Sequence, residues 1–322
     1  MKRIAISFGD PAGIGPEVVL RALADAPRGP IVFGARASLE RVAERFDLPW
    51  PQNVAFIDID PDRLSEQVVL GESGAAAGRL QLAALEAATD AVLAGEADAL
   101  CTAPVTKASM VQVGFGYPGH TEYLAARCGD RKVAMMLAGP TLRVVPLTGH
   151  MALGDVSSAL SIPPVVETLE LVSQALVEWF ACPRPRIALI AVNPHAGESG
   201  LCGSEEASIL VPARDEARRR LLDRVDLVGP LAADGFFGRY YGQDQQQFVG
   251  AGAFDAVICA YHDQALIPFK MIHTHDGANL TLGLPFVRTS PVHGSALDLA
   301  PSGTANPASM RYALSLAERL TR

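Results

Sequence analysis

The sequence predicts an α/β fold built on a largely parallel sheet, and three features of the chain support this prediction. Short apolar runs alternate with segments of helical periodicity from the first residues onward, a pattern that favours strands connected by helices. Hydrophobic residues make up 49% of the 322 residues, and most are Ala, Val and Leu, as is typical of a sheet buried under helices. Several apolar runs end abruptly in Gly, Pro, His, Asp, Asn or Thr, and ligands of open α/β sheets bind beyond the carboxyl ends of the strands.

The first third of the chain alternates regularly between strands and helices. Strands are expected at residues 4–8, 31–33, 54–57 and 99–101, each a short apolar run bounded by turn residues. Helices are expected from about Pro16, over 39–46 and over 79–93, where apolar residues recur at helical spacing. Residues 71–78, rich in Gly and Ala, are expected to form a loop.

The rest of the chain adds one antiparallel pair. The runs 133–137 and 142–146 flank Gly139-Pro140 and predict a hairpin. Helices are expected over 163–180, which has proline near its first turn, and over 307–320. Buried strands are expected at 187–192 and 256–259. No internal repeat or low-complexity linker marks a domain boundary.

Charge and cysteine content exclude several function classes. A net charge of −8 argues against nucleic-acid binding, because the basic residues of 214–224 alternate with acidic ones on an expected solvent-facing helix. No apolar run of about 18 or more residues predicts a transmembrane helix. The five cysteines are scattered without a CxxC pair, as expected for reduced thiols, and the first residues resemble a strand rather than a signal peptide. We therefore expect a cytoplasmic enzyme.

Three of the seven histidines directly follow predicted strands: His150, His195 and His262. A catalytic zinc site takes three protein ligands and leaves a position for water or substrate, and neutral imidazoles suit a borderline divalent ion. The histidines therefore predict a metal site, provided that their strand ends converge. The alternative, that each is an ordinary hydrogen-bonded or surface histidine, stays open because the three are far apart in the sequence.

Three polar residues interrupt apolar, turn-rich segments of this acidic chain: Lys270, Asn279 and Arg288. Arg offers a bidentate fork and Lys a point charge, so these residues predict an anion site. Thr121 is a candidate helix cap that would leave backbone N–H groups for a phosphate. The alternative interpretation is a pair of salt-bridge cations and an ordinary helix cap.

Six motifs between Ser7 and about Pro307 occur together and in order. They are Gly9-Asp10-Pro11-Ala12-Gly13-Ile14-Gly15-Pro16-Glu17, Thr102-Ala103-Pro104-Val105-Thr106-Lys107, Gly119-His120-Thr121-Glu122, Asn193-Pro194-His195-Ala196-Gly197-Glu198, Tyr261-His262-Asp263-Gln264 and Asn279-Leu280-Thr281-Leu282-Gly283-Leu284-Pro285. With them the chain resembles the 4-hydroxythreonine-4-phosphate dehydrogenase family of pyridoxal phosphate biosynthesis.

The resemblance implies a fold similar to isocitrate and isopropylmalate dehydrogenases, with two α/β subdomains and the active-site cleft between them. The subdomains would comprise about residues 1–118 with 276–322, and residues 119–275 with the interface of a homodimer. The implied reaction is oxidation of 4-phosphohydroxy-L-threonine by NAD or NADP with a divalent metal (Zn, Mg or Co). Its 3-keto acid product would decarboxylate to 3-amino-2-oxopropyl phosphate.

The resemblance also implies roles for single residues. His150, His195 and His262 correspond to metal ligands that come from both subunits. Substrate-binding positions correspond to His120, Thr121, Lys270, Asn279 and Arg288. Asp234, in an acidic loop near the substrate, and Lys270 are the candidates for the catalytic base, and the sequence leaves both open.

One segment departs from the family pattern. Val292 stands where the family usually has Asp before a histidine, and Ala300-Pro301-Ser302-Gly303 replaces a turn of the Ala-Gly-Lys-Gly type. The segment 291–296 instead resembles the adenosine-binding loop of isopropylmalate dehydrogenase. The cofactor residues implied are Ile14, His293, Gly294, Ser295, Asp298 and Asn306. The sequence also leaves open a family member that oxidises another phosphorylated four-carbon acid or a cis-dihydrodiol dicarboxylate.

Overall fold

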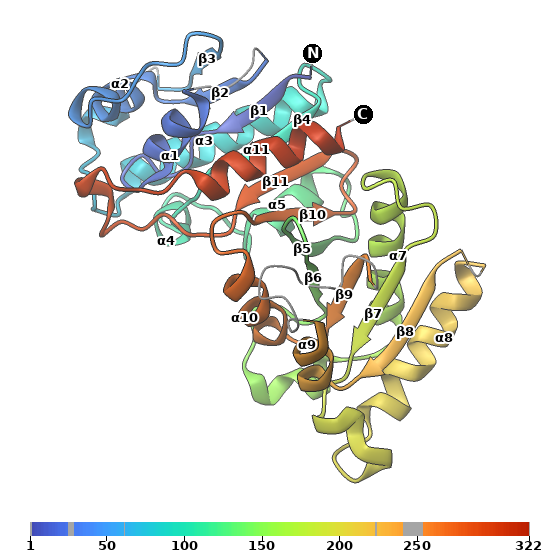
Figure 1. Ribbon diagram of the computed structural model, residues 1–322. Helices are drawn as coiled ribbons and strands as arrows, with labels where there is room; N and C mark the ends of the chain where they lie inside the picture. The colour runs from blue at the N-terminus through green and yellow to red at the C-terminus, as the bar shows by residue number, and fades with distance from the viewer. Residues whose placement is uncertain (1, 25–28, 61, 223, 241–253, 322) are drawn as a thin grey trace. The chain divides into compact units, whose positions relative to one another are not determined.

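The computed structural model describes residues 2–24, 29–60, 62–222, 224–240 and 254–321 (Figure 1). The chain divides into two compact units. The first comprises Met1–Arg131, His275–Leu280 and Leu284–Arg322, and the second comprises Lys132–Thr274 and Thr281–Gly283. Both units combine parallel strands with helices, which confirms the predicted α/β class.

The first unit contains a parallel sheet in the order β3-β2-β1-β4-β11. Its strands are β1 (Ile4–Ser7), β2 (Ile31–Gly34), β3 (Ala55–Asp58), β4 (Ala99–Thr102) and β11 (Val287–Pro291). Strands β1, β4 and β11 are buried along their whole length, as expected for strands covered on both faces. Strand β10 (Ala278–Leu282) lies next to β11, and its residues up to Leu280 belong to this unit.

Helices α3 and α11 pack against the strands of the first unit (Figure 1). The helices of this unit are α1 (Gly15–Leu23), α2 (Arg36–Arg45), η1 (Leu64–Gln67), α3 (Ala75–Leu93), α4 (Lys107–Val111), α5 (His120–Arg127), η6 (Ala300–Ser302) and α11 (Ala308–Leu320). The loop predicted over 71–78 is wrong from Ala75 onward, where α3 begins. Gly78 lies inside this helix, at a position where a Cβ would lie 2.1 Å from the carbonyl oxygen of Ser109 in α4. Its glycine therefore serves close helix packing rather than a turn.

The second unit contains strands in the order β5-β6-β9-β7-β8. They are β5 (Ala134–Ala138), β6 (Arg143–Pro146), β7 (Arg186–Ile190), β8 (Asp226–Leu231) and β9 (Ala256–Cys259). The predicted hairpin is confirmed, since β5 and β6 pair antiparallel, whereas β6, β9, β7 and β8 pair in parallel. The parallel pairing aligns the carboxyl ends of β6, β9 and β7 at one edge.

The helices of the second unit are η2 (Leu153–Asp155), α6 (Val156–Ala159), α7 (Ile162–Glu178), η3 (Pro194–Gly200), η4 (Glu206–Leu210), α8 (Val211–Arg220), α9 (Ala233–Tyr240) and α10 (His262–Ile272). Within the described residues, no single helix is long and apolar enough to cross a membrane, although the bent pair Leu153–Ala159 and Ile162–Glu178 together has the length and composition.

Two expectations about helices need correction. Residues 119–131, expected to begin the second subdomain, lie in the first unit. The reason is that α5 is anchored there: Arg127 forms an ion pair with Asp90 of α3, and Tyr123 contacts the ring of Phe115. The turn-rich segment expected around Lys270 is helical, because α10 runs through it despite Pro268.

Candidate active site

The second unit gathers two of the predicted histidines. His150 follows β6 and His262 begins α10 directly after β9, and these strands are neighbours. The two imidazole rings lie with their centroids 5.3 Å apart. They border a hollow of about 530 Å³ lined by Gly149, His150, Met151, Ala152, Leu153, Val156, Tyr261, His262 and Asp263. The convergence of these two strand ends is the one predicted from the sequence.

A neighbouring carboxylate orients the His262 ring. Nδ1 of His262 lies 2.7 Å from Oδ1 of Asp263, and a carboxylate can only accept, so Nδ1 donates. This contact leaves the lone pair on Nε2, the form that a metal ligand or a proton acceptor needs. The sequence motif contained Asp263, but its role was not predicted.

Two buried or half-buried polar side chains join the loops that follow β6, β9 and β7. Thr148 Oγ1 donates to the carbonyl oxygen of Ala260 at 2.9 Å. Gln264 accepts from the Ala260 N–H at 2.7 Å and donates to the carbonyl oxygen of Ala191 at 2.8 Å. Sequence reasoning missed both residues, although each lies within two residues of a predicted histidine.

His195 lies on a turn of unusual backbone shape. Residues His195 to Ser199 all have positive φ, between 43° and 77°, and His195 is exposed. In the part of the chain that the structure describes, no three His, Cys, Asp or Glu side chains come together as a group that could hold a metal ion. One chain therefore brings His150 and His262 together without His195, and the three-histidine site stays a prediction.

The two candidate bases are both exposed in the second unit. Asp234 lies in the first turn of α9, the helix that contacts the turn bearing His195. Lys270 lies in the last turn of α10, which begins at His262. The placement of these helices does not favour one base over the other.

The first unit holds a buried cation beside a neutral imidazole. Arg288, 3% exposed, donates through Nη2 to Thr102 Oγ1 at 2.7 Å and lies 3.2 Å from Nδ1 of His120. Burial lowers the pKa of Arg288 to about 10, so the side chain stays protonated at neutral pH. Burial, followed by the positive charge of Arg288, lowers the pKa of His120 to about 3, so the imidazole is neutral. Thr102 was not predicted as a site residue; its position at the end of β4 was the available signal.

Two more predicted substrate residues lie in this unit. Nε2 of His120 and Oδ1 of Asn279 are buried and, among the described residues, have no hydrogen-bond partner. Buried polar atoms of this kind call for a partner from outside the chain or from water. Thr121, in contrast, does not cap α5: the helix begins at His120, with Gly119 at the cap position. Because Gly119 has no side chain, the first N–H groups of α5 lack a side-chain cap.

The predicted cofactor loop is fixed to the Gly-rich first loop. The Ile14 N–H donates to the carbonyl oxygen of Ser295 at 2.9 Å, and the hydroxyls of Ser295 and Thr106 lie 2.7 Å apart. A Cβ on Gly13 would lie 2.5 Å from the Ser295 oxygen, so only glycine allows this approach. Asp10 is fully buried in the same loop, and burial raises the pKa of its carboxyl group although hydrogen bonds from Thr106, Ala12 and Gly13 oppose the shift.

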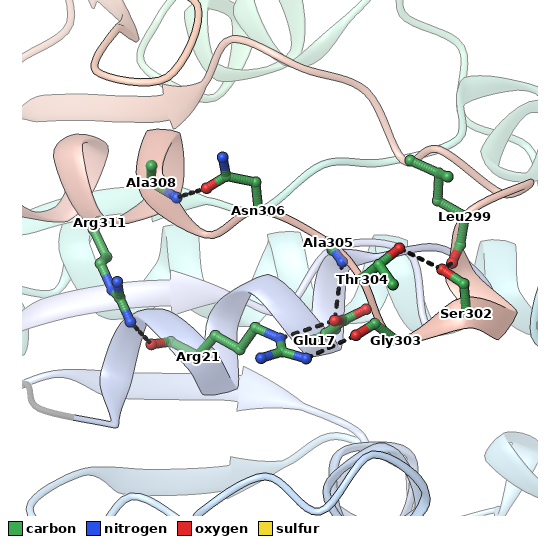
Figure 2. A network of polar contacts seen from close by, with 10 residues as sticks. All are labelled: Glu17, Arg21, Leu299, Ser302, Gly303, Thr304, Ala305, Asn306, Ala308 and Arg311. Atoms are coloured by element: carbon green, nitrogen blue, oxygen red, sulfur yellow. Dashed lines mark hydrogen bonds and ion pairs between the residues drawn. The ribbon is translucent and has the colours of Figure 1, made fainter.

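A second network holds the segment that carries Asn306 (Figure 2). Glu17, 2% exposed, accepts from Arg21 at 2.8 Å and from the Ala305 N–H at 3.1 Å. Arg21 also donates to the carbonyl oxygen of Gly303 at 2.8 Å. Asn306 accepts from the N–H of Ala308, the first residue of α11, at 2.9 Å. Helix α1 thus anchors the segment after the predicted cofactor loop, and Gly294, Asp298 and Asn306 are exposed to solvent.

The chain is similar to proteins of one family along nearly its whole length. The family described as pyridoxal phosphate biosynthetic protein PdxA matches residues 25–317. A 4-hydroxythreonine-4-phosphate dehydrogenase from Erythrobacter litoralis is 42% identical over 331 residues, covering 98% of this chain and 95% of that protein. One of the same name from Geobacter metallireducens is 39% identical over 340 residues, covering 99% and 96%.

Solved structures also match the chain along nearly its whole length. The 4-hydroxythreonine-4-phosphate dehydrogenase from Klebsiella pneumoniae matches with a TM-score of 0.86 and 33% identity, covering 100% of this chain and 98% of that one. A terephthalate 1,2-cis-dihydrodiol dehydrogenase from Burkholderia xenovorans LB400 matches with a TM-score of 0.66 and 30% identity, covering 99% and 98%.

Proposed function

The chain belongs to the pyridoxal phosphate biosynthetic protein PdxA family, and on this premise we propose that it oxidises 4-phosphohydroxy-L-threonine in pyridoxal phosphate biosynthesis. The chain is an oxidoreductase, as its dehydrogenase relatives are. In the proposed reaction, the C3 hydride passes to NAD or NADP and the hydroxyl proton to a base. The 3-keto acid then loses CO2 and gives 3-amino-2-oxopropyl phosphate.

The observation that carries this proposal is the buried Arg288 cation with His120 and Thr102. A phosphate accepts several hydrogen bonds, and a guanidinium in a low-dielectric position attracts it strongly. Neutral His120 can donate from one ring nitrogen, and its buried Nε2 lacks a partner among the described residues. We therefore assign Arg288 and His120 to the substrate phosphate, with Thr121 and Asn279 as further polar contacts and Lys270 as an additional cation.

His150 and His262 have the chemistry of ligands to a divalent ion, but two ligands are fewer than a catalytic metal site usually has. Imidazole nitrogens suit Zn²⁺ and similar ions, and Asp263 already orients the His262 ring. A catalytic site usually needs three protein ligands, and one chain brings two of the predicted three together. We propose that a homodimer supplies the missing ligand. A divalent ion bound there would polarise the substrate hydroxyl and lower its pKa.

Nicotinamide binding is assigned to the first unit. The packing of Ile14 against Ser295 fixes two loops that the proposal places at the cofactor, together with His293, Gly294, Asp298 and Asn306. For the proton, Asp234 and Lys270 remain the two candidates. Asp234→Asn and Lys270→Met separate them, because loss of the base lowers kcat far more than it raises KM.

The test is NAD(P)H formation by the purified protein loaded with Zn²⁺, Co²⁺ or Mg²⁺. The substrates are 4-phosphohydroxy-L-threonine, 4-phospho-D-erythronate, 4-phospho-D-threonate and a cis-dihydrodiol dicarboxylate. We expect preferred turnover of the first and its loss on chelation. Turnover of the dihydrodiol alone would contradict the proposal and favour the activity named for the Burkholderia xenovorans LB400 structure. Turnover of a four-carbon acid alone would move the enzyme to another phosphorylated substrate.

A further inference from the structure

The turn that carries His195 is held in a backbone conformation that its sequence does not favour. His195, Ala196, Glu198 and Ser199 have a Cβ, yet all four lie in the left-handed region together with Gly197. L-residues visit this region as single residues and rarely in succession. A run of this kind persists only where the surrounding structure enforces it, and such strain is concentrated at functional sites.

Asn193 and Glu206 make the contacts that enforce it. The Asn193 backbone N–H donates to Glu206 Oε1 at 2.8 Å, and its Nδ2 donates to Glu206 Oε2 at 3.0 Å. Glu206 is 7% exposed, so water competes little for these charge-assisted bonds. Nδ2 of Asn193 also donates to Glu205 at 2.8 Å, and Ser157 donates to the other oxygen of Glu205.

Two glycines allow the turn to close around this pair. A Cβ on Gly197 would lie 2.8 Å from Glu206 Oε2, and a Cβ on Gly203 would lie 2.3 Å from Asn193 Nδ2. The Cys202 N–H then donates to the carbonyl oxygen of Gly197 at 3.1 Å, which closes the far end of the turn. The base and the end of the turn are therefore both fixed, with His195 between them.

We propose that Asn193 and Glu206 are positioning residues for the oxidation reaction: they hold the turn Pro194–Gly200 left-handed and so fix the direction of the His195 side chain. This proposal rests on the function proposed above for His195. It goes beyond that function because neither Asn193 nor Glu206 is a ligand or a base in it. Loss of either residue should therefore change the direction of the His195 side chain.

The experiment compares Glu206→Gln with Glu178→Gln, the same change at an exposed position of α7 in the same unit. Glutamine keeps the size of Glu206 but sets an N–H donor against a donor of Asn193. Hydrogen exchange of amides 195–203 should become about tenfold faster or more, because one buried charge-assisted bond is lost. Exchange in β7 and β9 should stay unchanged, and kcat should fall about tenfold or more with KM within about twofold. Glu178→Gln should change neither the hydrogen-exchange rates nor kcat.

A second variant tests whether the turn itself is the cause. Ser199→Gly, added to Glu206→Gln, removes one side chain that disfavours positive φ and should recover several-fold of the lost kcat. If Glu206→Gln does not fold, Asn193→Ala replaces it, since it keeps the backbone bond and removes only Nδ2. Unchanged exchange in the turn, or equal acceleration throughout the second unit, would overturn the proposal. If His195→Ala proves fully active, the function assigned to His195 fails, and the positioning proposal fails with it even if the exchange result holds.

Discussion

The two units hold their candidate functional residues in different ways. In the first unit, Arg288 within β11 and Thr102 at the end of β4 are buried, and a hydrogen bond between them fixes the guanidinium. In the second unit, His150 and His195 are exposed, and His195 lies on a strained left-handed turn. The residues proposed to bind the anion are therefore preorganised within one unit, whereas the proposed histidine site involves a strained turn and, in our proposal, a ligand from a second copy of the chain.

The largest expected effect tests the preorganised part. Arg288→Gln should lower kcat/KM about a thousandfold, mainly through KM, because the buried cation that we assign to the substrate phosphate is lost. Steady-state kinetics checks this, with the exposed Arg186→Gln of the second unit as the matched control. A kcat/KM within tenfold of the wild type would remove Arg288 from the phosphate site.

The next effect concerns the pH dependence of stability. The folded-state pKa of His120, about 3, lies below its ordinary value of about 6.5, so below pH 6.5 the unfolded chain binds a proton that the folded chain does not. Stability should therefore fall from pH 6.5 to 4.5 by up to about 2 kcal/mol through His120 alone. His120→Asn should flatten this slope in denaturant unfolding. Equal slopes for the wild type and His120→Asn would show that the pKa of His120 is not lowered.

A smaller effect should come from the network around Glu17. Glu17→Gln keeps the shape but weakens the bonds from Arg21 and Ala305 that anchor the segment before Asn306. We expect KM for the nicotinamide cofactor to rise about fivefold, the loss of about 1 kcal/mol, with KM for the phosphorylated substrate unchanged. Arg36→Gln, which breaks an exposed ion pair with Glu40, is the control. A rise in both KM values would mean that Glu17 supports the whole unit instead.

The smallest effect should have opposite signs in the two units. Ser199→Gly should raise the free energy of unfolding by about 1 kcal/mol, because glycine tolerates the left-handed conformation. Ser315→Gly, at an exposed position of α11, should lower it by about 0.5 kcal/mol, because glycine is the poorer helix former. Thermal unfolding of both variants checks the signs. A destabilising Ser199→Gly would show that the turn is not strained in solution.

The sequence predicted most strands and the long helices because apolar periodicity records burial. It could not predict that α3 begins at Ala75, since Gly78 resembled a loop residue and its role in close packing against the backbone of Ser109 depends on a contact distant in sequence. It placed His150 and His262 correctly beyond neighbouring strands, because parallel strands share one edge. Thr102 and Gln264 were missed because each acts through a hydrogen bond to a residue far along the chain. Glu206 was missed because it lies outside the motifs of the sequence, although it binds Asn193 within one of them. The left-handed turn could not be predicted from the sequence either, because four of its five residues have no preference for positive φ.

The interrupted course of the chain between the units has a consequence for biosynthesis. The second unit is nearly continuous in sequence, from Lys132 to Thr274, whereas the first unit needs β11 and α11 from the end of the chain. During translation, the second unit can therefore approach its native contacts while β4 still lacks its neighbour β11. A nascent chain that ends near residue 274 should expose the unpaired edge of β4 to chaperones. We expect synthesis of residues 275–322, which include β11 and α11, to set the moment at which the ribosome-bound chain becomes resistant to protease.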